Sequence, residues 1–334
     1  MKNAHLLCFP HPSSLRRTTK YTSLLRISGA LHLALFDQPG KDDFPISPLM
    51  ERSSLMKIGC NTVDFRKHPF EKALQWIAEA GYEYVEVEAN MSWCDHADPY
   101  RDDPIKFKEK VASFGFKGIS GLGSHRELIT DDQGAKDLEY AIPWAKAAGI
   151  PVVLTGEGRL PEGMSEQEAL NVLKGRLERL VAVAEKHQVY LAMEPHGSIS
   201  LKPGGLSHIL SLAKSPWLGV NFDTANPHRG TYVGTTRKGF EWKLAEKSQA
   251  NEIVVLTPVA PLVKHVHIKD VIGKEAVTLG KGEVNLKECL RILKANGYNG
   301  VLSYETEGNQ TEEESQKMIA ESRNFMIEAL KEIE

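Results

Sequence analysis

From Met56 onward, short apolar runs alternate with longer amphipathic segments, and this alternation restricts the fold more than any other feature of the chain. The predicted strands are Lys57–Val63, Tyr82–Glu88, Lys117–Leu122, Pro151–Thr155, Val189–Glu194, Leu218–Asp223, Val263–Ile268 and Gly300–Glu305. Apolar residues that recur every three or four positions predict helices at Pro69–Ala80, Asp131–Ala148, Glu166–His187, Leu286–Asn296 and Glu312–Lys331. Glycine stands where a helix gives way to a strand at Gly81, Gly115, Gly149 and Gly297.

Repeated βα units on this scale predict the α/β class and a single (β/α)8 TIM barrel over residues 56–334. An open doubly wound sheet is the alternative. No GxGxxG follows a strand and no GxxxxGK[ST] is present, so a dinucleotide or P-loop site has no support.

Residues 1–55 differ from the rest, and we expect a disordered or loosely attached extension outside the fold. They carry Arg16, Arg17 and Lys20 among serines, with no acidic residue before Asp37. A targeting segment has this composition. The alternative is an upstream start, because Met56 opens MKIGCNTV, which suits a first strand directly after a start codon.

The charge balance argues against a polyanionic partner. The chain has 41 basic and 44 acidic residues, a formal net charge of −3, so we expect neither nucleic acid nor a membrane surface as partner. No apolar stretch is long enough to cross a bilayer. The four cysteines form no CxxC pair, which fits a reduced, cytoplasmic setting.

Four of the predicted strands end in residue types that bind metals: Glu194 in LAMEPHG, Asp223 in VNFDTAN, His267 in HVHIKD and Glu305 in LSYETEG. Active sites of such barrels lie at the carboxyl ends of the strands, so these side chains are expected to converge. The strand period of two puts His267 and Lys269 on the inner face. For each residue taken alone, an ordinary structural role is the alternative to metal binding. Together, three carboxylates and an imidazole call for a cation.

These endings resemble those of the xylose-isomerase-like TIM barrel family of sugar isomerases and epimerases, over about Lys57 to Leu330. The resemblance implies one divalent ion, usually Mn²⁺, Mg²⁺, Co²⁺ or Zn²⁺, bound by Glu194, Asp223, His267 and Glu305. It also implies that Glu194 and Glu305 move protons, with His265 either supporting the site or belonging to the core.

On this basis we expect a divalent-metal-dependent sugar isomerase or epimerase that acts on a keto-sugar or sugar phosphate by proton transfer through a metal-bound enediolate. Lys269 would stabilise the oxyanion or act as an acid, with a structural salt bridge as the alternative. Expected substrate contacts at the mouth, each with a local structural role as the alternative, are Trp93, His125, Glu157, His196, Asn226 and His228.

Three other functions remain open. A metal-dependent lyase could use the same site, by β-elimination or dehydration of a keto-sugar or keto-glycoside. The related abasic-site endonuclease is opposed by Asn226, which stands where that nuclease would place another histidine ligand, and by the lack of basic excess. A non-catalytic sugar-binding barrel is the third. The expected partner is a small carbohydrate, and the sequence leaves room for a homo-oligomer.

Overall fold

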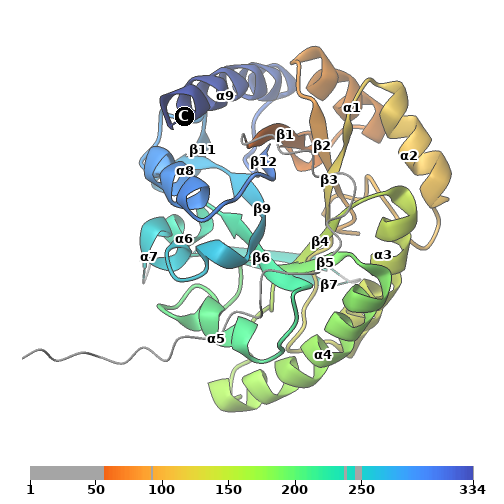
Figure 1. The fold of residues 1–334 in the computed structure, drawn as a ribbon, viewed down its shortest axis with the longest axis vertical. Coiled ribbons are helices and arrows are strands. Elements are labelled where there is room, and N and C mark those ends of the chain that lie inside the picture. Colours follow the sequence, from red (N-terminus) through yellow and green to blue (C-terminus); the bar gives the residue numbers. More distant parts are fainter. Residues whose placement is uncertain (1–55, 92, 237–238, 245–249, 334) are drawn as a thin grey trace, which may run out of the picture. The chain divides into compact units, whose positions relative to one another are not determined.

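The computed structural model describes residues 56–91, 93–236, 239–244 and 250–333. The interpretation of residues 1–55 as an extension lies outside these residues. The chain forms a closed barrel of parallel strands (Figure 1), in the spatial order β1–β12–β9–β6–β5–β4–β3–β2. The barrel strands are β1 (Lys57–Asn61), β2 (Tyr84–Glu88), β3 (Gly118–Gly123), β4 (Val152–Thr155), β5 (Tyr190–Met193), β6 (Leu218–Asp223), β9 (Val263–Ile268) and β12 (Val301–Tyr304). All predicted strands are present, so the barrel prediction is confirmed and the open sheet is wrong.

Helices surround the barrel, as Figure 1 shows. The predicted helices are confirmed to within two residues at each end: α1 (Phe70–Glu79), α3 (Asp132–Ala148), α4 (Glu166–His187), α8 (Leu286–Ala295) and α9 (Glu312–Ile333). Four further helices were not predicted from the sequence: α2 (Pro104–Ser113), α5 (Gly205–Ser211), α6 (Asn226–Arg229) and α7 (Glu252–Leu256). In α2 only Phe107 and Val111 are buried, so its apolar stripe is thin. Short 3-10 turns lie at Thr62–Phe65 and Ala260–Leu262.

Two hairpins outside the barrel were not predicted either. β7 (Thr231–Thr236) pairs with β8 (Gly239–Leu244), and β10 (Asp270–Ile272) pairs with β11 (Glu275–Val277), both antiparallel. The first follows β6 and the second follows β9, so both are insertions after the carboxyl ends of barrel strands. Such loops build the mouth of a TIM barrel.

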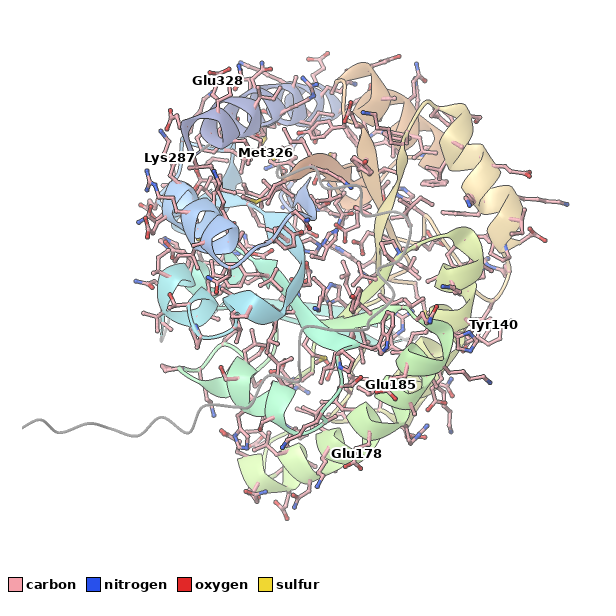
Figure 2. All side chains as sticks on the ribbon, in the orientation of Figure 1. Tyr140, Glu178, Glu185, Lys287, Met326 and Glu328 are labelled. Atoms are coloured by element: carbon pink, nitrogen blue, oxygen red, sulfur yellow. The ribbon has the colours of Figure 1, made fainter. Side chains whose placement is uncertain are left out.

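The helices pack an apolar face on the barrel, and α9 illustrates the pattern. Met326 is fully buried whereas Glu328 is exposed, and Figure 2 labels both side chains on this helix. Gly149 ends α3 in the left-handed conformation, with φ 77°, and its N–H caps the carbonyls of Ala145 and Lys146. The predicted glycine positions at the helix ends before strands are therefore confirmed at this joint. No helix of the described residues is both long and apolar enough to cross a membrane.

Side chains alternate along β9 as the strand period requires. Val266 and Ile268 belong to the hydrophobic core between strands and helices. His265 and His267 project to the other side, where their Nε2 atoms lie 3.7 Å and 2.8 Å from the carboxylate of Glu86 on β2. The inner face of the barrel thus carries the polar residues.

Candidate metal centre

His267 stands at the centre of a cluster of buried carboxylates. Its Nδ1 lies 3.1 Å from Oε2 of Glu305, 3.3 Å from Oε2 of Glu194 and 3.9 Å from Oδ2 of Asp223. All four side chains are at least 94% inaccessible to solvent, with exposed fractions of 0%, 6%, 1% and 0% in that order. The structure therefore brings together the four residues that the sequence analysis put at the mouth.

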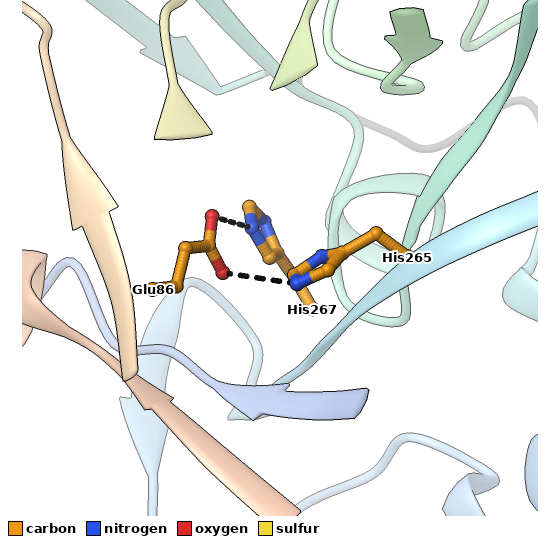
Figure 3. A group of neighbouring side chains, drawn as sticks. All are labelled: Glu86, His265 and His267. Carbon is orange, nitrogen blue, oxygen red and sulfur yellow. Dashed lines mark hydrogen bonds and ion pairs between the residues drawn. The ribbon is translucent and has the colours of Figure 1, made fainter. Parts of the chain in front are cut away.

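The opposite ring nitrogen of His267 contacts a residue that the sequence analysis missed. Nε2 lies 2.8 Å from Oε1 of Glu86, and Figure 3 shows this carboxylate facing the rings of both His265 and His267. Glu86 alternates with two core valines, Val85 and Val87, along β2. An acidic residue between buried valines was the available signal, because such a side chain has to face the barrel interior.

Asp223 has one oxygen occupied by the backbone and one that faces the cluster. Oδ1 accepts hydrogen bonds of 2.7 Å from the amides of Ala225 and Asn226, which fix the carboxylate at the start of α6. Oδ2 is buried and has no hydrogen-bond partner among the described residues, although Nζ of Lys269 lies 2.9 Å away. This oxygen is therefore available to a ligand.

Both oxygens of Glu194 are held by side-chain amides. Oε1 accepts from Nδ2 of Asn226 at 2.8 Å and Oε2 from Nδ2 of Asn221 at 2.7 Å. Asn221 is on β6 two residues before Asp223, so the inner face of one strand supplies both a carboxylate and an amide that orients another. Glu305 is held in a different way, by Nδ2 of Asn61 at 3.2 Å.

Lys269 adds a buried positive charge to the cluster. Its Nζ lies 2.9 Å from Asp223, 2.8 Å from Glu305 and 2.8 Å from Glu307. Glu307 also pairs with Arg229 on α6, at 2.8 Å. Both roles predicted for Lys269 are compatible with this position, since the ammonium makes buried ion pairs and also reaches two of the candidate ligands.

The charges of the cluster shift one another's protonation. Burial alone lowers the pKa of His267, but Glu305, Glu86 and Glu194 together raise it well above its ordinary value. Burial raises the pKa of Glu305, yet His267 and Lys269 outweigh it and lower the pKa. A protonated imidazole thus holds the carboxylates together when no metal is bound. Glu194, Asp223 and His267 offer ligand atoms within 4.8 Å of one another, which suits a divalent ion.

Three of the mouth residues predicted from sequence lie against Glu194. Nε2 of His125 is 3.4 Å from Oε2, Nδ1 of His196 is 3.2 Å from Oε1, and Asn226 donates to Oε1 as described. The two histidine rings meet edge to face with centroids 5.1 Å apart. Burial lowers the pKa of His196 to about 4, so this ring is neutral at neutral pH.

The other three mouth residues have partners elsewhere. Oε1 of Glu157 accepts from the amides of Ile199 and Ser200, at 2.9 Å and 2.8 Å, and so holds the loop after β5. The ring of Trp93 lies under the guanidinium of Arg66, 4.3 Å away. His228 lies with Nδ1 3.0 Å from Glu252 on α7, outside the carboxylate cluster. The structure does not bring these three to His267.

The fold and the cluster define an α/β barrel with a candidate metal centre at the carboxyl ends of its strands. The chain belongs to the xylose isomerase-like TIM barrel family, whose family model matches residues 74–329. A curated relative, an uncharacterized protein of Methanocaldococcus jannaschii, is 27% identical over 298 residues, which cover 84% of this chain and 93% of the relative.

Three solved structures share the fold. A D-tagatose 3-epimerase-like protein has 19% identity and a TM-score of 0.65, covering 83% of this chain and 98% of its own. The IOLI protein with a bound zinc atom has 16% identity and a TM-score of 0.65, covering 84% and 99%. A probable 3-DHS dehydratase from Bacillus anthracis has 15% identity and a TM-score of 0.62, covering 81% and 99%. Identities this low establish the common fold alone.

Proposed function

We propose that the chain is a divalent-metal-dependent isomerase or epimerase, which moves a proton on the carbon beside the carbonyl of a keto-sugar or sugar phosphate. One observation carries this proposal: Nδ1 of His267 lies between Glu194 and Glu305, at 3.3 Å and 3.1 Å. The two glutamates follow β5 and β12, strands separated in the barrel by β6 and β9. They therefore approach a substrate beside His267 from different directions, as a two-base proton transfer requires.

The donor set fits a resident metal ion. Glu194, Asp223, His267 and Glu305 would hold it, because they supply oxygen and imidazole ligands in a buried place, and Oδ2 of Asp223 is a buried oxygen without a hydrogen bond from any described residue. When bound, a divalent ion polarises a carbonyl oxygen and makes the neighbouring C–H more acidic. A bound zinc atom in the IOLI structure supports a metal here, and Mn²⁺ also suits these ligands.

The side chains around Glu194 differ from those around Glu305, which supports different roles for the two glutamates. Amide groups of Asn221 and Asn226 orient Glu194 without adding charge. Glu305, in contrast, is 2.8 Å from the ammonium of Lys269. Lys269 can therefore stabilise negative charge on a substrate oxygen next to Glu305 while that carboxylate exchanges the proton.

A lyase is the second candidate, and a specific observation favours it. His125 lies 3.4 Å from Glu194, so a further acid–base group is in reach of the same carbon and could protonate a leaving group. A probable dehydratase among the similar folds is in keeping with this chemistry. On this alternative, the proton removed by a glutamate is not returned, and a neighbouring C–O bond breaks instead.

Exchange in deuterated water tests the proposal and separates the two candidates. We would incubate metal-loaded protein with a panel of keto-sugars and sugar phosphates and follow products by NMR and mass spectrometry. An epimerase incorporates solvent deuterium with no other change of formula, whereas a lyase product lacks water or an aglycone. Glu194→Gln and Glu305→Gln should abolish exchange, and Glu328→Gln, which alters an exposed residue of α9, should not. Tight sugar binding without any exchange would contradict both enzymes.

A further inference from the structure

We propose that a second divalent cation, of the zinc type, binds beside the first, held by His125, His196 and Glu194. Each of the three side chains offers one ligand atom, and these atoms lie within 4.8 Å of one another. The expectation from sequence was a single metal and a substrate-binding role for both histidines. Glu194 would then belong to both positions, because its Oε2 lies near both His267 and His125 and its Oε1 lies near His196.

The surroundings of the His196 ring give an independent reason to expect a ligand at this position. Its exposed fraction is 3%, and neither ring nitrogen has a hydrogen-bond partner in the part of the chain that the structure describes. A buried imidazole without partners loses hydration at both nitrogens and gains nothing in return. A cation at Nδ1 compensates one of the two nitrogens for its lost hydration, since the lone pair of that nitrogen then binds the metal.

The contact between His196 and Glu194 has the spacing of two ligands on one ion. Nδ1 is 3.2 Å from Oε1 without the alignment of a hydrogen bond. Bonds of about 2.0–2.2 Å at tetrahedral angles separate two zinc ligands by roughly 3.3 Å. Oε1 also accepts from Asn226, but a carboxylate oxygen has a second lone pair for the metal.

The backbone holds both histidines in place. The amide of His125 donates to Oδ1 of Asn90 at 2.6 Å. The amide of His196 donates to Oγ of Ser200 at 3.1 Å, and the amide of Ser200 is itself bound by Glu157 at 2.8 Å. Through this contact with Ser200, Glu157 anchors the loop that carries His196. Ligands on anchored segments form a site with little loss of entropy on binding.

The ligand types distinguish the second position from the first. Two imidazoles and one carboxylate form a ligand set of catalytic zinc, which leaves a fourth position for water or substrate. The first position has three carboxylates and one imidazole, a set that also suits harder ions such as Mn²⁺. The two positions should therefore differ in their preference between Zn²⁺ and Mn²⁺.

Calorimetric titration of metal-free protein with Zn²⁺ alone tests this inference. The parent should bind two ions, and His125→Gln and His196→Gln should each bind one. His208→Gln is the matched control, because His208 is exposed on α5, and it should keep two. Asp223→Asn should lose the other ion, and its combination with His196→Gln should bind none. Circular dichroism and thermal unfolding in the presence of chelator establish that each variant is folded.

The outcomes separate this inference from the proposed function. A parent that binds one Zn²⁺, lost in Asp223→Asn but kept in both histidine variants, overturns the second position and leaves the first intact. In that case the histidines are substrate contacts, as the sequence suggested. A single ion that persists in Asp223→Asn and is lost in the histidine variants supports the second position and contradicts the first.

Discussion

Oε1 of Glu86 lies 2.8 Å from Nε2 of His267, on the side of the ring away from Glu194 and Glu305. A carboxylate in this position keeps the ring proton on Nε2 and leaves the lone pair of Nδ1 directed at the candidate metal. Glu86 and His267 come from β2 and β9, strands that are not neighbours in the barrel. A side chain on one wall of the barrel thus orients an imidazole on another.

Glu86→Gln should weaken metal binding by about 10–100-fold, the usual effect of losing a carboxylate that orients a histidine ligand. The side chain keeps its size, so the change lies in charge and in control of the tautomer. Mn²⁺ titration measures the affinity. Glu83→Gln, on the exposed neighbour that pairs with Lys117, should leave it unchanged. Equal affinities in the parent and Glu86→Gln would show that His267 needs no such support.

Metal-free protein should lose stability as pH rises through the raised pKa of His267. Neighbouring Glu305, Glu86 and Glu194 overcome burial and raise the folded-state pKa, so the protonated ring stabilises the fold fully below its unfolded value of about 6.5. From about pH 6.5 upward, the parent should lose more unfolding free energy than His267→Gln. Denaturant titrations measure both. Mn²⁺ affinity should rise over the same range, because metal displaces this proton.

Lys269→Met should separate the structural role of this residue from the catalytic one. Removing the ammonium takes a buried cation away from Asp223, Glu305 and Glu307, which should lower the unfolding free energy of metal-free protein by about 3–5 kcal/mol. Added Mn²⁺ should restore much of it, since the ion supplies positive charge. Turnover should remain about 10²–10⁴-fold lower even when the protein is metal-loaded. Full activity of the loaded variant would leave Lys269 with a structural role alone.

Two glycines offer a matched test of the fold. Gly149→Ala should destabilise the protein by about 1–2 kcal/mol, because φ is 77° at this helix end. Gly175→Ala should stabilise it by about 0.5–1 kcal/mol, since this position lies inside α4 and an added Cβ meets no atom of the described chain within 4 Å. Thermal unfolding compares the two variants. The two substitutions should change the stability in opposite directions. Destabilisation by both would contradict the assignment of Gly175 to an exposed helix interior.

The sequence predicts the barrel and the convergence of side chains at the carboxyl ends of its last strands. Both follow from the spacing of apolar residues along helices and strands. Alternation along β9 alone turns His267 inward, and the strand order of a closed barrel brings Asp223 and Glu305 to its two sides. Glu86 could not be paired with His267 in this way. Its contact depends on the width of the barrel and on the rotamers of both side chains.

The contacts of residues at the mouth were harder to predict, because these residues lie on loops. Glu157, Trp93 and His228 stand on segments after strands and were expected to contact substrate. Glu157 instead binds the amides of Ile199 and Ser200, and these donors become available only when that loop folds back. No period in the sequence encodes such a contact. His125 follows β3 by two residues and His196 follows β5 by three, and the structure puts both beside Glu194.

The central claim is that Asp223 and its partners hold a divalent ion, and electron paramagnetic resonance of added Mn²⁺ tests it most directly. Asn at position 223 can still accept the backbone hydrogen bonds at Oδ1, so the fold should persist. Asp132→Asn, at an exposed acid paired with Arg179, is the control. We predict that the parent and Asp132→Asn remove Mn²⁺ from solution and that Asp223→Asn does not. Equal binding by Asp223→Asn, or none by the parent, would contradict the account.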